Sequence, residues 1–351
     1  MLIYIKESLF YKENKMGNRN LSNERRKKHK AKIRRRRIAT LCGAILIILV
    51  LGIVISKVFF HNKDTKLSAK GPEETSTVTL TNKDKETATV ALSNKDKGNS
   101  TSTSKGQGLY LKLEDDPNAE DALEVFANLD GLLKGTKKYP VRTDGKKVVY
   151  LTFDDGPSTT NTPQVLDVLD KYNIKATFFI LGKSLEEGKT SEDILKRIAS
   201  DGHAIGNHSY SHDYNYLYPG RTINPDNFMA DINKCTERIK KVLGDDFDTR
   251  VIRFPGGYWS WEGRTGIRPI LDEKGYAIID WNTLNEDAQG AKKDANGLVE
   301  CLKKNTDALG PDADSVVVLM HDTYGKEETV KSLPGIIQYF KDKGFEFKTI
   351  K

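Results

Sequence analysis

Two adjacent carboxylates follow an apolar run in the C-terminal part of the chain, because Asp154 and Asp155 come directly after residues 148–153. In a hydrolase, one such carboxylate can bind a metal ion while the other takes a proton from the attacking water. Successive residues of a strand point in opposite directions, so we expect that the two side chains do not easily bind one ion together. A turn-capping pair of Asp155 with Gly156 is the alternative interpretation, and the pair alone does not decide between the two.

Two histidines at a spacing of four residues, His208 and His212, are candidate metal ligands. A helical turn would present both imidazoles on one side, and a carboxylate from another strand end would complete a three-ligand site with open positions. Such a pair also arises by chance on exposed helices, so the spacing alone is weak support. His203 has no matching role, and we expect it to be structural.

Two further residues could stabilise charge or transfer a proton. Arg253 precedes a Phe-Pro-Gly-Gly segment, and its guanidinium could hold Asp154 ionised and oriented through a bidentate contact. His321 follows the apolar run 315–320, and a protonated histidine at that place could donate to a leaving group. An ordinary surface ion pair and a core histidine are the alternative interpretations.

The order of these segments resembles that of the polysaccharide deacetylases, the NodB-homology or carbohydrate esterase family 4 enzymes, and in particular membrane-anchored bacterial peptidoglycan N-acetylglucosamine deacetylases. The resemblance covers about residues 137–351 and implies the removal of N-acetyl groups from an amino-sugar polymer. The segments that carry it are Thr-Phe-Asp-Asp-Gly (152–156), His-Ser-Tyr-Ser-His (208–212), Arg-Phe-Pro-Gly-Gly (253–257) and Leu-Met-His-Asp (319–322).

The resemblance implies a role for each candidate. It makes Asp154 the general base, His321 the general acid, and Asp155, His208 and His212 the ligands of a divalent metal. Zinc is the expected ion for two imidazoles and one carboxylate, with cobalt, nickel and manganese as alternatives.

Four more residues receive implied roles around this centre. Arg253 would orient the base, Leu319 would shape a pocket for the acetyl methyl group, and the backbone N–H of Gly256 would donate to the oxyanion. Asp287 matches the carboxylate that favours a protonated histidine as the acid.

The sequence departs from the family pattern at two places. Gly256 stands where many relatives carry tyrosine, so the backbone donor is kept but an aromatic wall is missing. Leu284 and Ala288 replace the first aspartate and the final tryptophan of the usual Asp-x-x-Asp-Trp motif, which puts the tuning role of Asp287 in doubt. The aromatic residues that could supply the missing groove wall are Trp281, Tyr258 and Trp259.

Alternating strand-like and helix-like runs must position these residues. Repeated strand-helix units indicate an α/β fold with a parallel sheet, whose chemistry gathers at the carboxyl ends of the strands. The resemblance favours the closed form, a distorted (β/α) barrel with fewer than eight regular repeats. The strand-like runs are 148–153, 176–181, 203–207, 251–254, 277–281 and 315–320, and the helix-like runs are 163–172, 193–200, 226–243, 266–273, 297–305 and 329–341.

The charge of the 351-residue chain is unevenly distributed. The net charge is +7, but residues 1–37 alone carry +11, which leaves −4 for the remainder and does not support a nucleic-acid-binding domain. Of the three cysteines, Cys42 lies in an N-terminal apolar run, and we expect Cys235 and Cys301 to be free thiols in preference to a disulfide.

The N-terminal third predicts attachment to a membrane. Residues 38–57 include nineteen uncharged positions, enough for one transmembrane helix, and follow a basic tail, 1–37, that we expect in the cytoplasm. A cleaved signal peptide is the alternative, but the run is long and ends in a poor cleavage site. We interpret 58–108, rich in Ser, Thr, Lys and Asn, as a linker, 109–136 as a helical pre-segment, and 137–351 as the extracellular catalytic domain.

The leading hypothesis is a tethered, metal-dependent hydrolase of an extracellular N-acetylated polysaccharide, most simply peptidoglycan. A chitin-oligosaccharide or exopolysaccharide deacetylase is the second hypothesis, and an inactive wall-binding scaffold is a third from another class. A scaffold has no chemical need for the full set of catalytic residues, which argues against the third hypothesis. The basic tail could serve as a nucleic-acid arm, but its place beside the apolar run favours a topology signal. The sequence does not indicate an oligomeric state.

Overall fold

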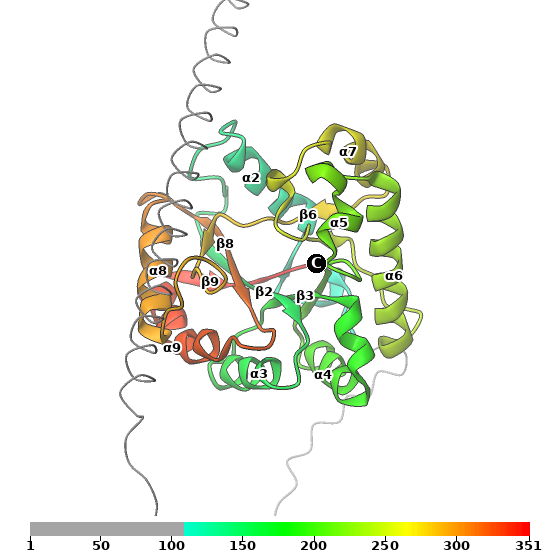
Figure 1. Ribbon diagram of the computed structural model, residues 1–351. Helices are drawn as coiled ribbons and strands as arrows, with labels where there is room; N and C mark the ends of the chain where they lie inside the picture. Colours follow the sequence, from blue (N-terminus) through cyan, green and yellow to red (C-terminus); the bar gives the residue numbers. More distant parts are fainter. Residues whose placement is uncertain (1–108) are drawn as a thin grey trace, which may run out of the picture. The chain divides into compact units, whose positions relative to one another are not determined.

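A computed structural model describes residues 109–351 of the chain (Figure 1). The predicted cytoplasmic tail, the anchor at 38–57 and the linker at 58–108 lie outside the described residues. Among the helices of 109–351, none is both long and apolar enough to cross a membrane.

A parallel sheet of eight strands forms the centre of the fold, in the order β6-β5-β4-β3-β2-β8-β7, with β9 paired to β2. Each pairing within this sheet is parallel, as the strand-helix alternation predicts. The strands are β2 (Lys147–Gly156), β3 (Thr177–Ile180), β4 (Ala204–Asn207), β5 (Val251–Ile252), β6 (Ala277–Ile278), β7 (Thr283–Leu284), β8 (Ser315–His321) and β9 (Phe345–Phe347).

The sheet curls, but its ladder of hydrogen bonds does not close. Strands β6 and β7 end the row on its two sides, and they are not paired with each other in the part of the chain described. Only residues 279–282 join them, with Ile279 N–H donating to Ile252 O at 2.9 Å and Asn282 N–H donating to Val317 O at 3.2 Å. The expectation of an α/β parallel sheet is therefore confirmed. Within the described residues the expected closed barrel is not formed: the sheet curls but stays open between β6 and β7, and we call this opening the seam.

Helices surround the strands, and Figure 1 shows α3, α4, α6, α8 and α9 arranged around the sheet. They form where an apolar stripe faces the sheet. In α6, Phe228, Ile232, Cys235 and Ile239 are all buried at a helical spacing, and Asn224 caps the first turn by accepting from Asn227 N–H at 3.1 Å. The helices are α2 (Ala122–Leu133), α3 (Asn161–Lys171), α4 (Lys189–Ser200), α5 (Tyr214–Leu217), α6 (Pro225–Leu243), α7 (Arg264–Glu273), α8 (Ala295–Asp307) and α9 (Glu327–Asp342), with short 3₁₀ turns η1 (Leu113–Asp115), η2 (Gly182–Glu187), η3 (Pro219–Arg221) and η4 (Tyr258–Ser260).

The side chains of β2 alternate between two cores. Val149, Leu151 and Phe153 pack in the cluster between the sheet and the helices, whereas Val148 and Tyr150 pack inside the curl of the sheet. This alternation has the period of two that a strand imposes. Continued along the strand, it directs the side chains at positions 152 and 154 into the curl, which decides where the first catalytic candidate points.

The segment before residue 137 packs on the same folded unit. Strand β1 (Ala119–Glu120) pairs in parallel with β10 (Thr349–Ile350) at the chain's end, and the ammonium of Lys351 lies 2.7 Å from the carboxylate of Asp116. Within β10, the N–H of Ile350 donates to Thr177 Oγ1 at 3.0 Å, at the start of β3. This small sheet therefore lies against the amino-terminal ends of the strands.

The apolar face predicted for α2 is partly wrong. The spacing of Leu123, Phe126, Leu129 and Leu133 predicts a helix that packs on the domain that follows, but Leu123 and Leu133 are 40% and 42% exposed. Ala122 and Val125 are buried beside Leu129 instead, which rotates the packed face by about one residue. The cap residue Asp121, which accepts from Leu123 N–H at 2.7 Å, starts the helix at a point that the apolar spacing does not reveal.

The two cysteines of the described region are free, as predicted. Cys235 is buried in α6, and Cys301 is half-buried in α8.

Candidate active site

The carboxyl ends of β2, β4, β5 and β8 bring the predicted catalytic residues together. Asp154 lies near the end of β2, and its register partner on β8 is His321. Register partners on adjacent parallel strands point to the same face of the sheet, and Tyr150 and Val317, four residues earlier on each strand, pack in the inner core. The candidate base and the candidate acid therefore both project from the inner face. Asp154 is 2% exposed.

Asp155 reaches the same site through an unusual backbone conformation. Its φ of +70° lies in the left-handed region, and the pairing of β2 with β3 is irregular between Asp154 and Gly156. In a regular strand its side chain would point away from that of Asp154, as the alternation predicts. The irregularity turns it back, so that an oxygen of each carboxylate lies near His208 Nε2, at 3.6 Å for Asp154 and 3.4 Å for Asp155.

The two histidines meet in a loop, and the helical turn expected for them is wrong. Residues 208–213 form the connection between β4 and α5, and both Ser209 and His212 have positive φ values, 73° and 55°. The loop is held from outside by the buried carboxylate of Asp231, whose Oδ2 accepts from Tyr210 N–H at 2.8 Å and from Ser211 N–H at 2.9 Å. The loop thus brings the two imidazoles to the same carboxylate, as the expected helical turn would have done.

His208 has a defined tautomer. Its Nδ1 lies 2.9 Å from the carbonyl oxygen of Arg253, so Nδ1 carries the proton and donates, which leaves the lone pair on Nε2 facing Asp155. Burial lowers the pKa of His208 to about 3, although the charge of Asp155 acts in the opposite direction. A neutral imidazole with a free Nε2 is the form that binds a metal.

Asp155, His208 and His212, together called the ligand cluster here, can hold a cation. Their ligand atoms all lie within 4.8 Å of one another, and Asp155 Oδ1 is 3.4 Å from Nε2 of each histidine. This oxygen is buried and has no hydrogen-bond partner among the residues described. A carboxylate oxygen buried without a donor is costly, and a cation would compensate it, so the cluster fits a divalent metal ion.

Arg253 holds the candidate base Asp154 through one contact instead of the bidentate pair predicted. The guanidinium is fully buried, and its Nη1 donates to Asp154 Oδ1 at 2.7 Å. Nη1 also donates to Thr152 Oγ1 at 2.7 Å, while Nε and Nη2 donate to the Ile279 and Asp280 carbonyls at 2.7 and 3.1 Å. A buried arginine needs such partners, because its N–H groups are removed from bulk solvent and each lost hydrogen bond is costly. One oxygen of Asp154 is therefore left facing the ligand cluster.

His321 is held by Asp287 despite the altered motif around that aspartate. The two carboxylate oxygens of Asp287 accept from His321, one from Nδ1 at 2.8 Å and the other from the backbone N–H at 2.9 Å. Thr329 Oγ1 donates to Asp287 Oδ2 at 2.8 Å. Burial disfavours the charged imidazolium, but the hydrogen bond and charge of Asp287 outweigh burial and raise the pKa of His321 above its ordinary value.

The Asp287→Asn variant should therefore lose activity at a lower pH than the wild type. A general acid works only while protonated, so with His321 in this role the rate falls as pH rises through its raised pKa, and removing the carboxylate moves that fall to lower pH. The pH profile of kcat/KM measures this. Glu286→Gln is the matched control, because the Glu286 carboxylate contacts Asn305 and Lys293 instead of the histidine. Coincident basic limbs in the wild type and Asp287→Asn would contradict the pairing.

The four predicted substrate contacts differ in how far the structure exposes them near the ligand cluster. Leu319 is 6% exposed, and because it lies two residues before His321 on β8, its side chain points to the same inner face of the sheet. Gly256 is exposed with a φ of +76°, and Trp281 is half-buried, with its ring centroid 5.7 Å from Cζ of Arg253. Tyr258 is only 6% exposed and packs against Phe254, so the structure does not bring its ring to the site surface.

Next to the Asp154–Asp155 pair, a buried carboxyl group lies against a glycine. Asp322 accepts from Thr162 Oγ1 at 2.5 Å, and burial raises its pKa to about 7. A Cβ atom at Gly156 would lie 2.5 Å from both carboxyl oxygens of Asp322. Gly156 is therefore required by packing, in addition to its place in the acidic motif.

The Gly156→Ala variant should be less stable than the wild type by ~1–3 kcal/mol, because a methyl group overpacks this contact. Gly266→Ala is the matched control, since the nearest atom to a Cβ there is 3.8 Å away and the residue lies within α7. The control should be neutral or slightly stabilising, because alanine favours a helix over glycine. Equal chemical denaturation midpoints for the wild type and Gly156→Ala would show that the contact with Asp322 relaxes freely.

Sequence reasoning gave no role to several residues that organise the site. Thr152 lies in the Thr-Phe-Asp-Asp-Gly segment and accepts from Arg253. Thr329 lies in the first turn of α9 and donates to Asp287, the carboxylate that holds His321. The carboxylate of Asp280 accepts from Tyr258 N–H at 3.0 Å. Asp280 follows an apolar run, as Asp154 does, so the sequence contained a pattern that could have identified it. For Thr329 no sequence signal exists, because its role depends on the packing of α9 beside the loop after β7.

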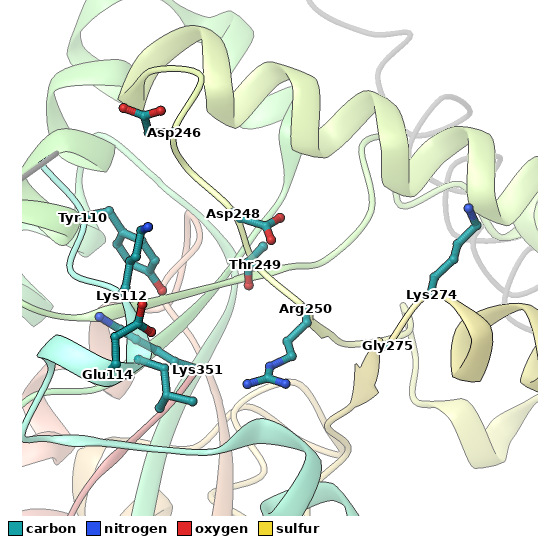
Figure 2. Close-up of a pocket in the computed structure, with 11 residues that line it drawn as sticks. Tyr110, Lys112, Glu114, Asp246, Asp248, Thr249, Arg250, Lys274, Gly275 and Lys351 are labelled. Atoms are coloured by element: carbon teal, nitrogen blue, oxygen red, sulfur yellow. The ribbon is translucent and has the colours of Figure 1, made fainter.

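A pocket of about 550 Å³ lies at the opposite end of the sheet, where the loops before β5 and β6 meet the segment at 110–114 (Figure 2). In (β/α) folds this end supports stability while chemistry occurs at the carboxyl ends. Its charged lining mixes both signs, which favours no single class of ligand. The charged residues are Lys112, Glu114, Asp246, Asp248, Arg250, Lys274 and Lys351.

The curled α/β sheet, with the ligand cluster beside a candidate proton-transfer pair, and the comparisons that follow define the class of the protein as a hydrolase. The family profile described as polysaccharide deacetylase matches residues 141–276. A peptidoglycan-N-acetylglucosamine deacetylase of Bacillus cereus is 34% identical over 208 residues, which make up 58% of this chain and 67% of that protein. A chitin deacetylase of Colletotrichum lindemuthianum is 34% identical over 207 residues, 58% of this chain and 77% of the relative.

A solved carbohydrate esterase family 4 esterase from Streptococcus mutans matches the fold with a TM-score of 0.61 and 32% identity, over 70% of this chain and all of that one. The catalytic domain of a peptidoglycan N-acetylglucosamine deacetylase from Eubacterium rectale matches with a TM-score of 0.51 and 31% identity, over 62% of this chain and 94% of that domain. The chain belongs to the polysaccharide deacetylase family, and the resemblance predicted from its motifs is confirmed.

Proposed function

We propose that the protein is a metal-dependent N-deacetylase of peptidoglycan, acting on its N-acetylglucosamine residues. The observation that carries the proposal is the position of Asp154. One of its oxygens is bound by Arg253 at 2.7 Å, and the other lies 3.6 Å from Nε2 of His208 in the ligand cluster. A fixed proton acceptor beside a cation site is the arrangement that amide hydrolysis by water requires.

The ion would be held by Asp155, His208 and His212, and zinc is the default for this donor set. When bound, such an ion polarises the amide carbonyl and lowers the pKa of water. The chain's own groups supply the other requirements. Asp154 accepts the proton of the attacking water, and Arg253 keeps the carboxylate in position during that transfer.

Charge that develops on the carbonyl oxygen needs a donor, and the backbone N–H of the exposed Gly256 can provide one. The leaving nitrogen needs a proton, which His321 gives from its other ring nitrogen, Nε2, because its Nδ1 is engaged with Asp287. The products are acetate and a free amine on the sugar. Leu319, inward-facing and nearly buried beside His321, would contact the acetyl methyl group.

Two other polymers are possible substrates of the same chemistry. The chitin deacetylase relative is as similar in identity as the first peptidoglycan deacetylase, 34% in each case, so chitin oligosaccharides are the second candidate. An exopolysaccharide would also present the N-acetyl group. An inactive scaffold is disfavoured, because the six residues Asp154, Asp155, His208, His212, Arg253 and His321 are present and converge at one end of the sheet.

Acetate release from purified polymers tests the choice of substrate. The zinc-loaded protein should release acetate and generate free glucosamine amines from isolated cell wall, and faster than from chitin oligosaccharides or an exopolysaccharide. Asp154→Asn serves as the blank for contaminating enzymes. Acetate from chitin oligosaccharides alone would replace peptidoglycan by chitin, and no acetate from any polymer with metal bound would favour the scaffold.

The location of the enzyme is also a proposal. The apolar run at 38–57 and the basic tail before it support a single-pass anchor with the catalytic domain outside the cell, close to the wall. A tethered enzyme meets a polymer at a high effective concentration. Protease added to wall-free cells should cut within 58–108 and release an active domain, and recovery of that domain only from the cytoplasm would contradict this topology.

A further inference from the structure

Tyr214 is an exposed aromatic residue directly beside the ligand cluster. It opens α5, two residues after His212, and the two ring centroids are 5.2 Å apart. The tyrosine is 43% exposed. Neither the proton-transfer pair nor the ligand cluster uses it, so its exposed ring needs another explanation.

The hydroxyl end of Tyr214 reaches the loop that carries the candidate oxyanion donor. A Cβ atom at Gly256 would lie 3.1 Å from Tyr214 Oη and 3.4 Å from Cζ. The ring therefore extends from a residue of the ligand cluster to the backbone of Gly256. The acetamide group must lie between these two features during hydrolysis, so the sugar that bears it comes next to Tyr214.

Buried neighbours hold the tyrosine ring in place. Trp261 packs edge to face against it at 5.0 Å between centroids, and the Trp261 indole N–H donates to Pro255 O at 2.9 Å. Trp261 in turn stacks on Tyr218 at 4.1 Å, and Asp213 caps α5 by accepting from Asn215 N–H at 2.9 Å. Tyr214 is thus the exposed end of a rigid aromatic stack, and a preorganised ring loses little conformational entropy on binding.

Gly256 cannot carry an aromatic side chain of its own without strain. Its φ of +76° lies in the left-handed region that favours glycine. The same position would place any Cβ close to both Tyr214 and Trp261, at 3.1 Å from each. The aromatic surface missing from position 256 is therefore available only from a neighbouring element, and Tyr214 lies there.

We propose that Tyr214 is a sugar-binding residue of the active site, whose ring packs against the apolar face of the pyranose that carries the N-acetyl group. Flat aromatic rings supply apolar contact and orientation in ligand sites of this kind. This inference rests on the proposed function for its substrate, an N-acetylated amino-sugar polymer. It assigns binding and orientation of the sugar to a residue outside the family-matched motif positions.

Binding of an N-acetylglucosamine hexamer to the full-length, zinc-loaded protein tests the proposal. In an Asp154→Asn background, which prevents turnover, Tyr214→Ala should raise the Kd about tenfold, whereas Tyr214→Phe should raise it less than about threefold because the ring remains. Tyr214→Leu should bind as weakly as the alanine variant. Tyr216→Ala is the matched control, because Tyr216 lies on the same helix with 42% exposure, and it should bind like the parent.

Metal content and the thermal midpoint accompany each measurement, so that displacement of His212 or partial unfolding is detected. Weaker binding at full metal occupancy supports the proposal. A Kd for Tyr214→Ala equal to that of Tyr216→Ala would overturn it, as would weaker binding that only follows metal loss. Because binding is measured without turnover, a wild type that releases no acetate would refute the proposed function while the role of Tyr214 is still decided by the Kd values.

Discussion

The Asp154→Asn variant is expected to lose about 10²–10⁴-fold in kcat while its metal content stays at the wild-type level. The amide cannot accept the proton of the attacking water, so the variant lacks the base. Its side-chain oxygen can still accept from Arg253 Nη1, which donates to Asp154 Oδ1 at 2.7 Å in the wild type. The fold and the ligand cluster should therefore be preserved, which separates loss of chemistry from loss of structure.

Acetate release at saturating substrate, with metal content measured on the same sample, checks this expectation. Asp193→Asn is the matched control, because this carboxylate pairs with Lys189 on the exposed surface of α4 and takes no part in the site. The control should be indistinguishable from the wild type. Near-normal turnover of Asp154→Asn would assign the proton transfer to another group.

The Asp155→Asn variant, one residue further along the chain, is expected to lose both activity and metal. Its carboxylate oxygen lies 3.4 Å from Nε2 of each histidine, and a neutral amide oxygen there weakens attraction to a divalent cation. Treatment of the wild type with a chelator should silence the enzyme in the same way, and added zinc should restore only the wild type. Full activity after exhaustive removal of metal would show that the cluster is not the site of chemistry.

The order of strands and helices, and the residues that meet at the carboxyl ends, could be predicted from the sequence because both depend on local patterns. Apolar runs followed by polar residues mark β2 and β8 and place Asp154 and His321 at the carboxyl ends of strands, whereas the pairing of β2 with β8 is known only from the structure. The free state of Cys235 was also predictable, from its place within a helix-like run.

The conformations that aim the ligands could not be predicted. The left-handed φ of Asp155 and of His212 depends on the irregular pairing of β2 and on a loop fixed by Asp231, which is distant in sequence. A helical turn and a regular strand were the simplest assumptions, and the structure replaces both. The single contact between Arg253 and Asp154 has the same origin, because the other guanidinium groups are used by carbonyls of the link at the seam.

Contacts between elements that are distant in the sequence could not be predicted either. Thr329 supports Asp287 only because α9 packs beside the loop after β7, and Tyr214 approaches Gly256 only because α5 lies beside the loop after β5. In α2, the packed face consists of Ala122, Val125 and Leu129, although the larger Leu123 and Leu133 are exposed, so residue size did not indicate the face. These features depend on tertiary packing, which propensity and spacing do not encode.

The division of labour between the two adjacent carboxylates is tested most directly by measuring bound metal per chain beside acetate release in the same preparations. We expect one ion and acetate release for the wild type, one ion and no acetate release for Asp154→Asn, and neither for Asp155→Asn. Acetate release by the metal-free wild type, or loss of the ion from Asp154→Asn, would contradict the assignment of the base to Asp154 and of the ligand to Asp155.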